Sequence, residues 1–326
     1  MKQHFVPRSY LKQFTNRDGM VHAIDLDLLK YNKNVRHEPK SLEQIARAIN
    51  YYTIQPEHVS FVPELGNYDP MYLEKEFHKY ENHISKIVDQ IKDQKGAIKA
   101  EDAKLLLYAL VDLKLRNPFF HEKVMNNKKE EVFNQLLGDN FEATIRDLDL
   151  SEHPLLSHEE MIDTVEELKN KFFNDLVYAK AMQLHGLVKR KSTDGSIYKK
   201  IIDTLLPCDW IVMKSKRKFI TNDNPGVSID EGGRVHNTKF NDNFIYCVPL
   251  APSFCLTISP ASKDSNYRLN SKSKSLRYGD IDDNAINVLN AAHSHYMRKH
   301  IFVGDISLAD TIVQSINVNR QIQRDT

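Results

Sequence analysis

Four polar side chains in separate parts of the chain could together carry acid–base and charge-stabilising chemistry. They are His4, Glu81, Arg116 and Asp223. An imidazole can act as a general base near neutral pH, carboxylates can hold Mg²⁺ or Mn²⁺, and a guanidinium can bind a phosphate through two hydrogen bonds. These residue types suit hydrolysis of a phosphodiester. The prediction requires that the fold bring all four residues into one cavity.

Asp223 lies between two amides, in a stretch from Phe219 to Pro225 where a strand-like apolar run enters a turn. We interpret Asp223 as a metal ligand and Asn222 and Asn224 as substrate-binding residues. The alternative is an Asx turn that satisfies its own backbone, because Asp and Asn before proline are common in turns.

A basic segment immediately precedes this turn, and the pattern predicts that it forms a hairpin between strands at 210–213 and 219–221. Its cationic side chains are Lys214, Lys216, Arg217 and Lys218. Cations beside a carboxylate site would attract the phosphates of a nucleic acid, and we predict that Lys218 contacts substrate. A solvated hairpin tip is the alternative.

Glu81 belongs to a helix that is predicted to begin at Met71. Glu74, His78 and Glu81 are spaced to share one face of that helix. The three could ligate a metal, and Glu81 lies closest to the apolar stripe. The alternative is a solvated helix face.

Arg116 falls near the end of a very apolar predicted helix over residues 101–117. A buried guanidinium needs an anion, because an unpaired buried charge is very costly. Asp112, one helical turn earlier, is the simplest candidate partner. The functional alternative is an arginine that steadies a phosphate.

His4 follows Gln3 and precedes an apolar cluster near the start of the chain. We predict that His4 activates water and that Gln3 and Arg8 contact substrate. A structural histidine that hydrogen-bonds to backbone is the alternative, because buried polar groups usually exist to satisfy partners.

The elements that must position these residues change in type along the chain. Residues 1–70 are mixed, residues 71–206 are helical, and residues 207–326 alternate as strands do before closing helices at 282–298 and 308–321. The segregation predicts an α+β fold with a helical central region, a C-terminal mostly antiparallel β-sheet and terminal helices. We expect one unit over residues 1–326.

Several finer predictions accompany this order. The pattern predicts a helix with a capping box over residues 41–48 and a short strand at 51–54. It also predicts helices at 119–137 and from Ser157 to about residue 187, and a tight hairpin turn at 230–233.

Composition restricts the class of protein. Hydrophobic residues make up 41% and charged residues 27%, which is typical of a globular protein. No apolar run approaches the roughly 18 residues of a membrane span, and the N-terminus lacks a signal-peptide core. We therefore expect a cytoplasmic protein with no membrane partner, and its oligomeric state stays open.

Other compositional features disfavour particular kinds of site. The net charge of +1 provides no global field for nucleic acid, so binding would depend on local basic patches. Three cysteines without a CxxC motif argue against a disulfide framework or a zinc knuckle. The chain has only 11 glycines and no Walker or GxGxxG motif, which disfavours a nucleotide-phosphate loop.

Short motifs also carry a resemblance to a known family. They are Gln3-His4-Phe5-Val6-Pro7 with Tyr10, Leu11 and Phe14, Ala48 to Thr53, Leu115-Arg116-Asn117-Pro118, Phe219 to Pro225, and Pro249 to Pro252. Over most of its length the chain resembles the bacterial family known as domain of unknown function 4238. It departs from the pattern at Asn222 and Asn117, where a small hydroxyl residue and a threonine are expected. The resemblance implies which residues form the signature and carries no activity.

Two functions from different classes remain. The first is a metal-dependent nuclease or phosphodiesterase in which Glu81 and Asp223 hold Mg²⁺ or Mn²⁺, with phage defence or toxin action as the expected role by analogy. The alternative is a non-catalytic module that binds a ligand or a protein, in which the same polar residues form a buried network that fixes the core.

Overall fold

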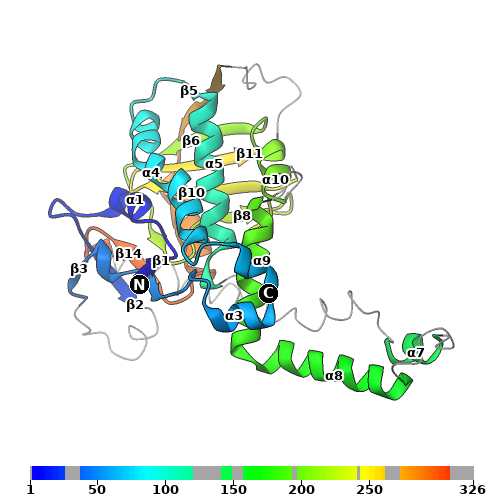
Figure 1. The fold of residues 1–326 in the computed structure, drawn as a ribbon. Helices are drawn as coiled ribbons and strands as arrows, with labels where there is room; N and C mark the ends of the chain where they lie inside the picture. The colour runs from blue at the N-terminus through cyan, green and yellow to red at the C-terminus, as the bar shows by residue number, and fades with distance from the viewer. Residues whose placement is uncertain are drawn as a thin grey trace, which may run out of the picture. The chain divides into compact units, whose positions relative to one another are not determined.

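The computed structural model describes residues 2–25, 37–119, 141–148, 157–192, 197–240, 243–260 and 272–308, and shows an α+β protein (Figure 1). The chain divides into two compact units. The first comprises Met1–Tyr51, Glu74–Pro118 and Arg190–Thr326, and the second comprises Tyr52–Leu73 and Phe119–Lys189. All four candidate catalytic residues belong to the first unit.

The first unit contains a six-stranded sheet of order β13-β6-β11-β10-β8-β9. Its strands are β6 (Asp209–Lys214), β8 (Val227–Ile229), β9 (Val235–His236), β10 (Ile245–Ala251), β11 (Phe254–Ser259) and β13 (Arg277–Asp280). All neighbours are antiparallel except β13 and β6. The alternating pattern predicts strands at 210–213, 244–250 and 254–259 and a hairpin turn at 230–233, and β6, β10, β11 and the β8–β9 hairpin confirm these predictions.

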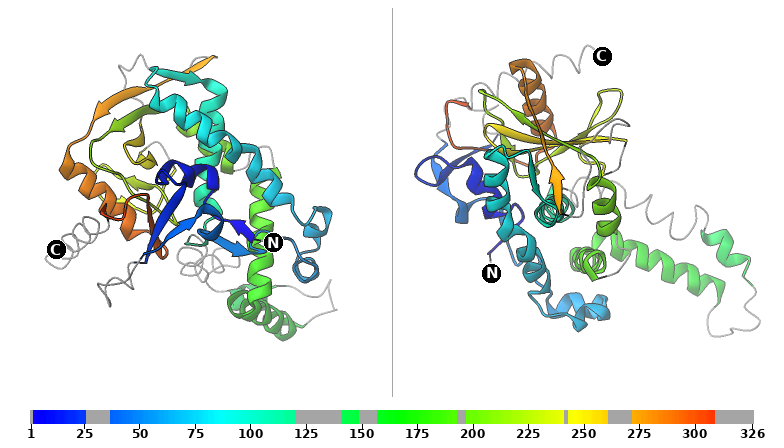
Figure 2. Two further views of the ribbon diagram at one scale, coloured as in Figure 1. Left: turned by 90° about the vertical axis from the view of Figure 1, so that its left-hand side faces the viewer. Right: turned by 90° about the horizontal axis from the view of Figure 1, so that it is seen from above.

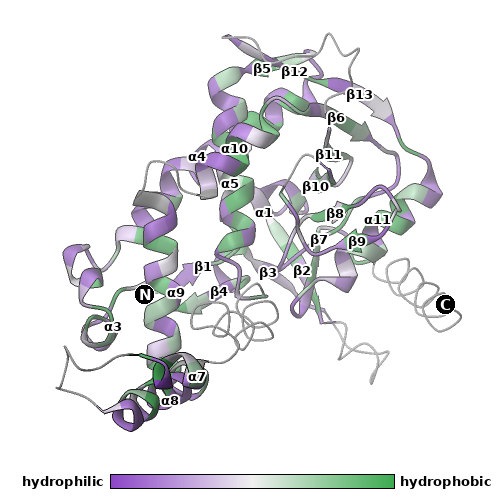
Figure 3. Ribbon diagram, turned by 90° about the vertical axis from the view of Figure 1, so that its right-hand side faces the viewer, coloured by the Kyte–Doolittle hydropathy of each residue, from purple (hydrophilic) through white to green (hydrophobic). Residues whose placement is uncertain are grey.

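Two helices lie on opposite sides of this sheet (Figure 2). One is α11 (Asp283–His295), which packs through Ile286 and Leu289 against Val227 and Cys247. The other is α5 (Ala100–Leu115), which is buried on nearly every side, as its Leu- and Val-rich sequence predicted. Figure 3 shows hydrophobic colouring along much of α5.

A four-stranded sheet of order β3-β2-β14-β7 carries the Asn222–Asp223 signature. Its strands are β2 (Met20–Asp25), β3 (Pro39–Ser41), β7 (Thr221–Asn222) and β14 (His300–Val303). The prediction of a basic hairpin between 210–213 and 219–221 is wrong, because β6 and β7 belong to different sheets. The basic segment connects the two sheets instead.

The N-terminal signature is held by short elements. Strand β1 (Lys2–His4) pairs with β4 (Arg47–Ile49). A separate two-stranded sheet, which does not include the signature, is formed by β5 (Ala97–Lys99) and β12 (Ser273–Ser275). The predicted capping box at Ser41 is present, but only a 3₁₀ turn, η2 (Leu42–Gln44), follows it. The helix stops there because the residues after it pair with β1. The predicted strand at 51–54 is absent from the structure, which has a turn there.

After β1 the chain forms α1 (Arg8–Leu11) and η1 (Lys12–Phe14). The helices α4 (Tyr72–Lys92) and α10 (Ile197–Leu205) confirm the helices that the pattern predicts from Met71 and over residues 196–206. The remaining helices described are α3 (Pro56–Phe61), η3 (Pro63–Asn67), α7 (Phe141–Arg146), α8 (His158–Asn174) and α9 (Leu176–Ser192).

The prediction of one long helix from Ser157 to about residue 187 is wrong, because α8 ends at Asn174 and α9 begins at Leu176. Asp175 between them has extended backbone, and its Oδ1 accepts the N–H groups of Val177 and Tyr178. A carboxylate that caps a new helix in this way favours a break. The helices predicted at 119–137 and 308–321 lie outside the described residues, apart from their first residues.

Two predictions from composition can be compared with the structure. All three cysteines are free and buried, as small apolar residues are. Of the helices that the structure describes, none combines the length and apolar character needed to cross a membrane.

Candidate functional site

Arg116 forms a buried ion pair at the end of α5. Its side chain is 1% exposed, and its Nη1 pairs with Oε1 of Glu81 on α4. The guanidinium carbon lies 4.5 Å from the centre of the Phe77 ring. Glu81 is thus an anionic partner that helix spacing did not indicate. Asp112, the predicted partner, accepts the hydroxyl of the buried Tyr198.

His4 lies within the electrostatic reach of Arg116. Burial lowers the pKa of the half-buried His4, and the charges of Arg8, Arg116 and Arg47 act in the same direction. Its Nε2 donates to the carbonyl of Leu42 at 3.0 Å, since a carbonyl can only accept. The neutral ring therefore keeps the lone pair of Nδ1, which could take a proton from water.

Glu74 lies on α4 two turns before Glu81 and also feels the charge of Arg116. Burial raises the pKa of Glu74, while Arg116 and His78 lower it. Glu74, His78 and Glu81 were predicted as a metal group. Among the residues that the structure describes, however, no group of three His, Cys, Asp or Glu side chains could hold a metal ion.

Asp223 is 1% exposed and forms its contacts with the connection between α11 and β14. Its carboxylate accepts the backbone N–H groups of Arg298 at 2.7 Å and of Lys299 and His300 at 2.8 Å each. Burial raises the pKa of Asp223, and the three N–H groups act in the opposite direction. Both carboxylate oxygens of Asp223 thus bind the backbone of residues 298–300.

The flanking amides, which we predicted to bind substrate, also form internal contacts. Oδ1 of Asn222 accepts the N–H of Asn224 at 2.7 Å, and its Nδ2 donates to the carbonyl of His293. Asn224 accepts the buried Lys114 ammonium through both its carbonyl and its Oδ1, at 3.1 and 3.0 Å. The Asx turn is therefore present, with Asn222 rather than Asp223 as its side-chain acceptor.

The other predicted substrate-binding residues are separated. Gln3 is fully buried in β1, opposite Ala48. Arg8 is exposed and pairs with Glu43 at 2.9 Å. Lys218 donates to Ser253 Oγ at 3.1 Å from an exposed position. Their role in binding substrate stays a prediction.

Arg116 thus pairs with Glu81, and its charge also acts on His4, whereas Asp223 belongs to a network with other partners. The two are linked through Asn117, which follows Arg116 and whose Nδ2 donates to the carbonyl of Asp223 at 2.5 Å. Metal binding by Glu81 and Asp223 together stays a prediction.

A match to a family model shows which protein family this chain belongs to. The model of the family described as "Protein of unknown function (DUF4238)" matches residues 2–305. The chain belongs to the DUF4238 family. The match confirms the resemblance seen in the motifs, and the matched segment contains His4, Glu81, Arg116 and Asp223. No curated protein and no solved structure matches the chain.

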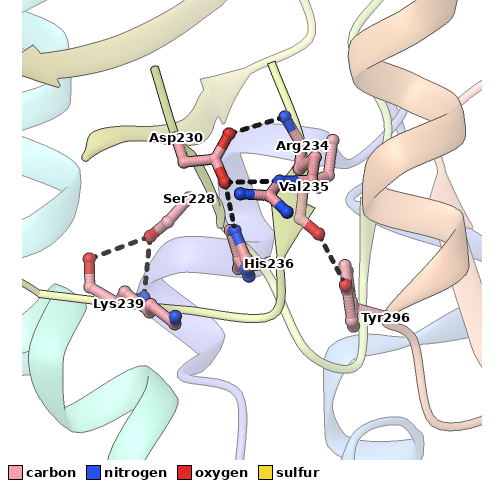
Figure 4. Close-up of polar contacts among 7 residues, drawn as sticks. All are labelled: Ser228, Asp230, Arg234, Val235, His236, Lys239 and Tyr296. Carbon is pink, nitrogen blue, oxygen red and sulfur yellow. Dashed lines mark hydrogen bonds and ion pairs between the residues drawn. The ribbon is translucent and has the colours of Figure 1, made fainter. Parts of the chain in front are cut away.

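The DUF4238 chain also contains a polar cluster that sequence reasoning missed, on the β8–β9 hairpin (Figure 4). Asp230 accepts the backbone N–H of Arg234, its Nε, and Nε2 of His236, at 2.9, 3.0 and 3.0 Å. The bond from His236 and those from Arg234 lower the pKa of Asp230 to about 2. The polar residues flanking the Gly232–Gly233 turn were the signal available in the sequence.

Ser228 stands opposite His236 in the register, so the hairpin contains Ser, His and Asp together. The Ser228 hydroxyl, however, donates to the carbonyl of Lys239 at 3.1 Å and accepts its N–H at 2.8 Å. A nucleophilic serine must instead bond to the histidine. These residues therefore stabilise the hairpin, which Tyr296 also holds through the carbonyl of Val235 (Figure 4).

His293 in α11 should make the stability of this DUF4238 protein depend on pH. Burial lowers the pKa of His293 from 6.5 to about 4. The unfolded chain therefore binds one more proton than the native state between these values, and stability falls as pH drops from 6.5 towards 4. The expected loss is about 3 kcal/mol.

Urea unfolding at a series of pH values measures this effect. His293→Asn retains a donor for the carbonyl of Leu289, which His293 Nδ1 contacts at 2.7 Å, and should lose this part of the pH dependence. His295→Asn, at an exposed position of the same helix, is the matched control. Equal pH dependence in the two variants would contradict the prediction.

Proposed function

We propose that this DUF4238 protein hydrolyses phosphodiester bonds and that nucleic acid is its substrate class. The observation that carries the proposal is the position of Arg116, which pairs with Glu81 while its charge acts on both His4 and Glu74. A base, an acid and a cation in one electrostatic environment are the groups that acid–base cleavage of a phosphate ester requires.

Each group has a role that follows from its surroundings. His4 is held neutral with Nδ1 available, so it accepts a proton from the attacking water. Arg116 is buried, and its field acts through a medium of low dielectric on the negative charge of the phosphoryl oxygens in the transition state. Glu81 positions the guanidinium as its ion-pair partner.

Glu81 is paired with Arg116, and both oxygens of Asp223 accept backbone N–H groups. The roles proposed for His4 and Arg116 therefore do not depend on a metal ion, and metal binding by Glu81 and Asp223 stays a prediction that the assay below tests. We propose that such an activity operates in the cytoplasm and serves phage defence or toxin action.

The test compares cleavage of single- and double-stranded DNA and RNA by the wild type and by His4→Gln, with Mg²⁺, with Mn²⁺ and with a chelator. Glutamine places a donor near the position of Nε2 and can keep the bond to Leu42, but it cannot act as a base. We expect kcat to fall by about 10²–10⁴-fold. His83→Gln, at an exposed position of α4, is the control and should cleave normally. Equal activity of His4→Gln and wild type would refute the proposed role.

The second candidate is a non-catalytic module that binds nucleic acid or another ligand. The network around Asp223 favours it, since the carboxylate and both neighbouring amides contact backbone and Lys114. Binding of nucleic acid by the wild type without cleavage under any of the assay conditions would select this candidate.

A further inference from the structure

Glu74 has an unusual environment for a glutamate on a helix surface. Its Oε2 is buried and has no hydrogen-bond partner among the residues that the structure describes. Its Oε1 lies 3.6 Å from Nε2 of His78, one helical turn later. Burial without a hydrogen-bond donor costs an ionised carboxylate more than a neutral carboxylic acid, because the charged form loses more solvation. The geometry therefore favours a neutral carboxyl group.

His78 provides a connection from this carboxyl group to water. The side chain of Glu74 is 16% exposed and that of His78 is 54% exposed. An imidazole can take up and release a proton near neutral pH. His78 can therefore exchange a proton with solvent on one side and with Glu74 on the other.

We propose that Glu74 is the proton donor of the site around His4 and Arg116, and that His78 restores its proton from solvent. This inference rests on the proposed phosphodiester hydrolysis and gives a specific role to Glu74, which that proposal names only as lying in the field of Arg116. Glu74 and Glu81 lie on one helix face but differ in environment, because Glu81 pairs with Arg116 and Glu74 has an oxygen without a hydrogen-bond partner among the described residues. Different environments allow two carboxyl groups to divide acid and charge-stabilising roles.

Every proton that moves in the proposed reaction has a donor and an acceptor. As the bond from water oxygen to phosphorus forms, Nδ1 of His4 takes one proton from the water. As the bond from phosphorus to the departing sugar oxygen breaks, Glu74 gives its proton to that oxygen. The Glu74 carboxylate then regains a proton through His78, and His4 releases its proton to solvent.

Some of the charged groups that face Glu74 lower its pKa and others raise it. Arg116 on α5 and His78 on α4 favour its carboxylate, and Glu81 on α4 disfavours it. Burial is the largest influence and raises the pKa of Glu74. The neutral acid thus persists to a higher pH than in an exposed glutamate.

The first test requires no activity. In the full-length protein with ¹³C-labelled glutamate, the carboxyl signal of Glu74, assigned with Glu74→Gln, should titrate above 4.5, the ordinary value for glutamate. Because a protonated His78 favours the carboxylate, His78→Gln should raise the midpoint further. Titration of Glu74 at or below 4.5 would overturn the proposal.

The second test uses the leaving group. With a nucleic acid, Glu74→Gln should lower kcat by about 10²–10⁴-fold and remove the fall in rate at high pH. With bis(p-nitrophenyl) phosphate the loss should be much smaller, because nitrophenolate leaves without a proton. Glu101→Gln should behave as wild type. Equal losses on both substrates, or no loss on either, would overturn the donor role alone. Absence of cleavage by the wild type would overturn the proposed function and the donor role with it.

Discussion

Replacing Asp223 with alanine is expected to lower the free energy of unfolding by about 2–4 kcal/mol. The carboxylate accepts three backbone N–H groups from residues 298–300 at 2.7–2.8 Å, and it is 1% exposed. Alanine leaves these donors without their charged acceptor. The cost stays moderate because Arg298 and Lys299 are exposed residues whose hydrogen bonds to Asp223 are only partly buried, so we expect water to replace the carboxylate as their acceptor. Chemical denaturation followed by circular dichroism measures the loss.

Asp280→Ala is the matched control for this experiment. The Asp280 side chain is 89% exposed and lies 3.7 Å from the Lys214 ammonium, so its removal should leave stability unchanged. If Asp223→Ala kept full stability but lost cleavage of nucleic acid, Asp223 would be a reacting group, as first predicted from the sequence. Loss of stability identifies it as the residue that holds β7 against the start of β14.

Breaking the ion pair between Glu81 and Arg116 is expected to have the largest effect on stability. Glu81→Leu leaves a guanidinium that is 1% exposed without this anion, which should cost about 3–5 kcal/mol. The double variant Glu81→Leu/Arg116→Met removes both charges and keeps apolar volume. It should recover most of the lost stability, because an apolar pair often replaces a buried ion pair at little cost.

The double variant also separates structure from function. If the pair serves catalysis, the variant should be stable and should still lack cleavage of nucleic acid. Normal cleavage by the stable double variant would show that the pair is structural. Glu43→Gln, which removes the exposed pair with Arg8, is the control and should change neither property.

The local pattern of apolar and polar residues was sufficient to predict many helices and strands, because this pattern follows directly from which side chains are buried. The alternating runs at 210–213, 244–250 and 254–259 became β6, β10 and β11, and the Leu-rich run over 101–117 became the buried α5. Burial on one face or on all sides leaves a periodicity in the residues themselves. Prediction failed where a single polar residue interrupts a periodic run, as Asp175 does between α8 and α9.

The sequence indicated which residue types form the candidate site, but it indicated only some of the contacts that these residues make. The charge of Arg116 acts on His4, and Arg116 pairs with Glu81 on α4; a shared catalytic role for these residues stays a prediction. Asp223 was chosen for the same reason as Glu81, yet its oxygens bind backbone of the α11–β14 connection. Neither Lys114, which contacts Asn224, nor the Asp230–His236 contact had a periodic signal.

The amino-acid sequence by itself determined the α+β class, the DUF4238 membership and most of the strands and helices of the first unit. These depend on hydrophobic spacing, turn residues and short motifs, all of which act over a few neighbouring positions. Only the tertiary structure decided which carboxylate faces Arg116, which binds backbone, and which lies beside His78 without a donor for one oxygen. Helix spacing places Glu74 beside His78, but the other choices depend on contacts between residues 35 to more than 70 positions apart, such as Arg116 with Glu81 and Asp223 with Arg298. Spacing along the chain does not encode those long-range contacts.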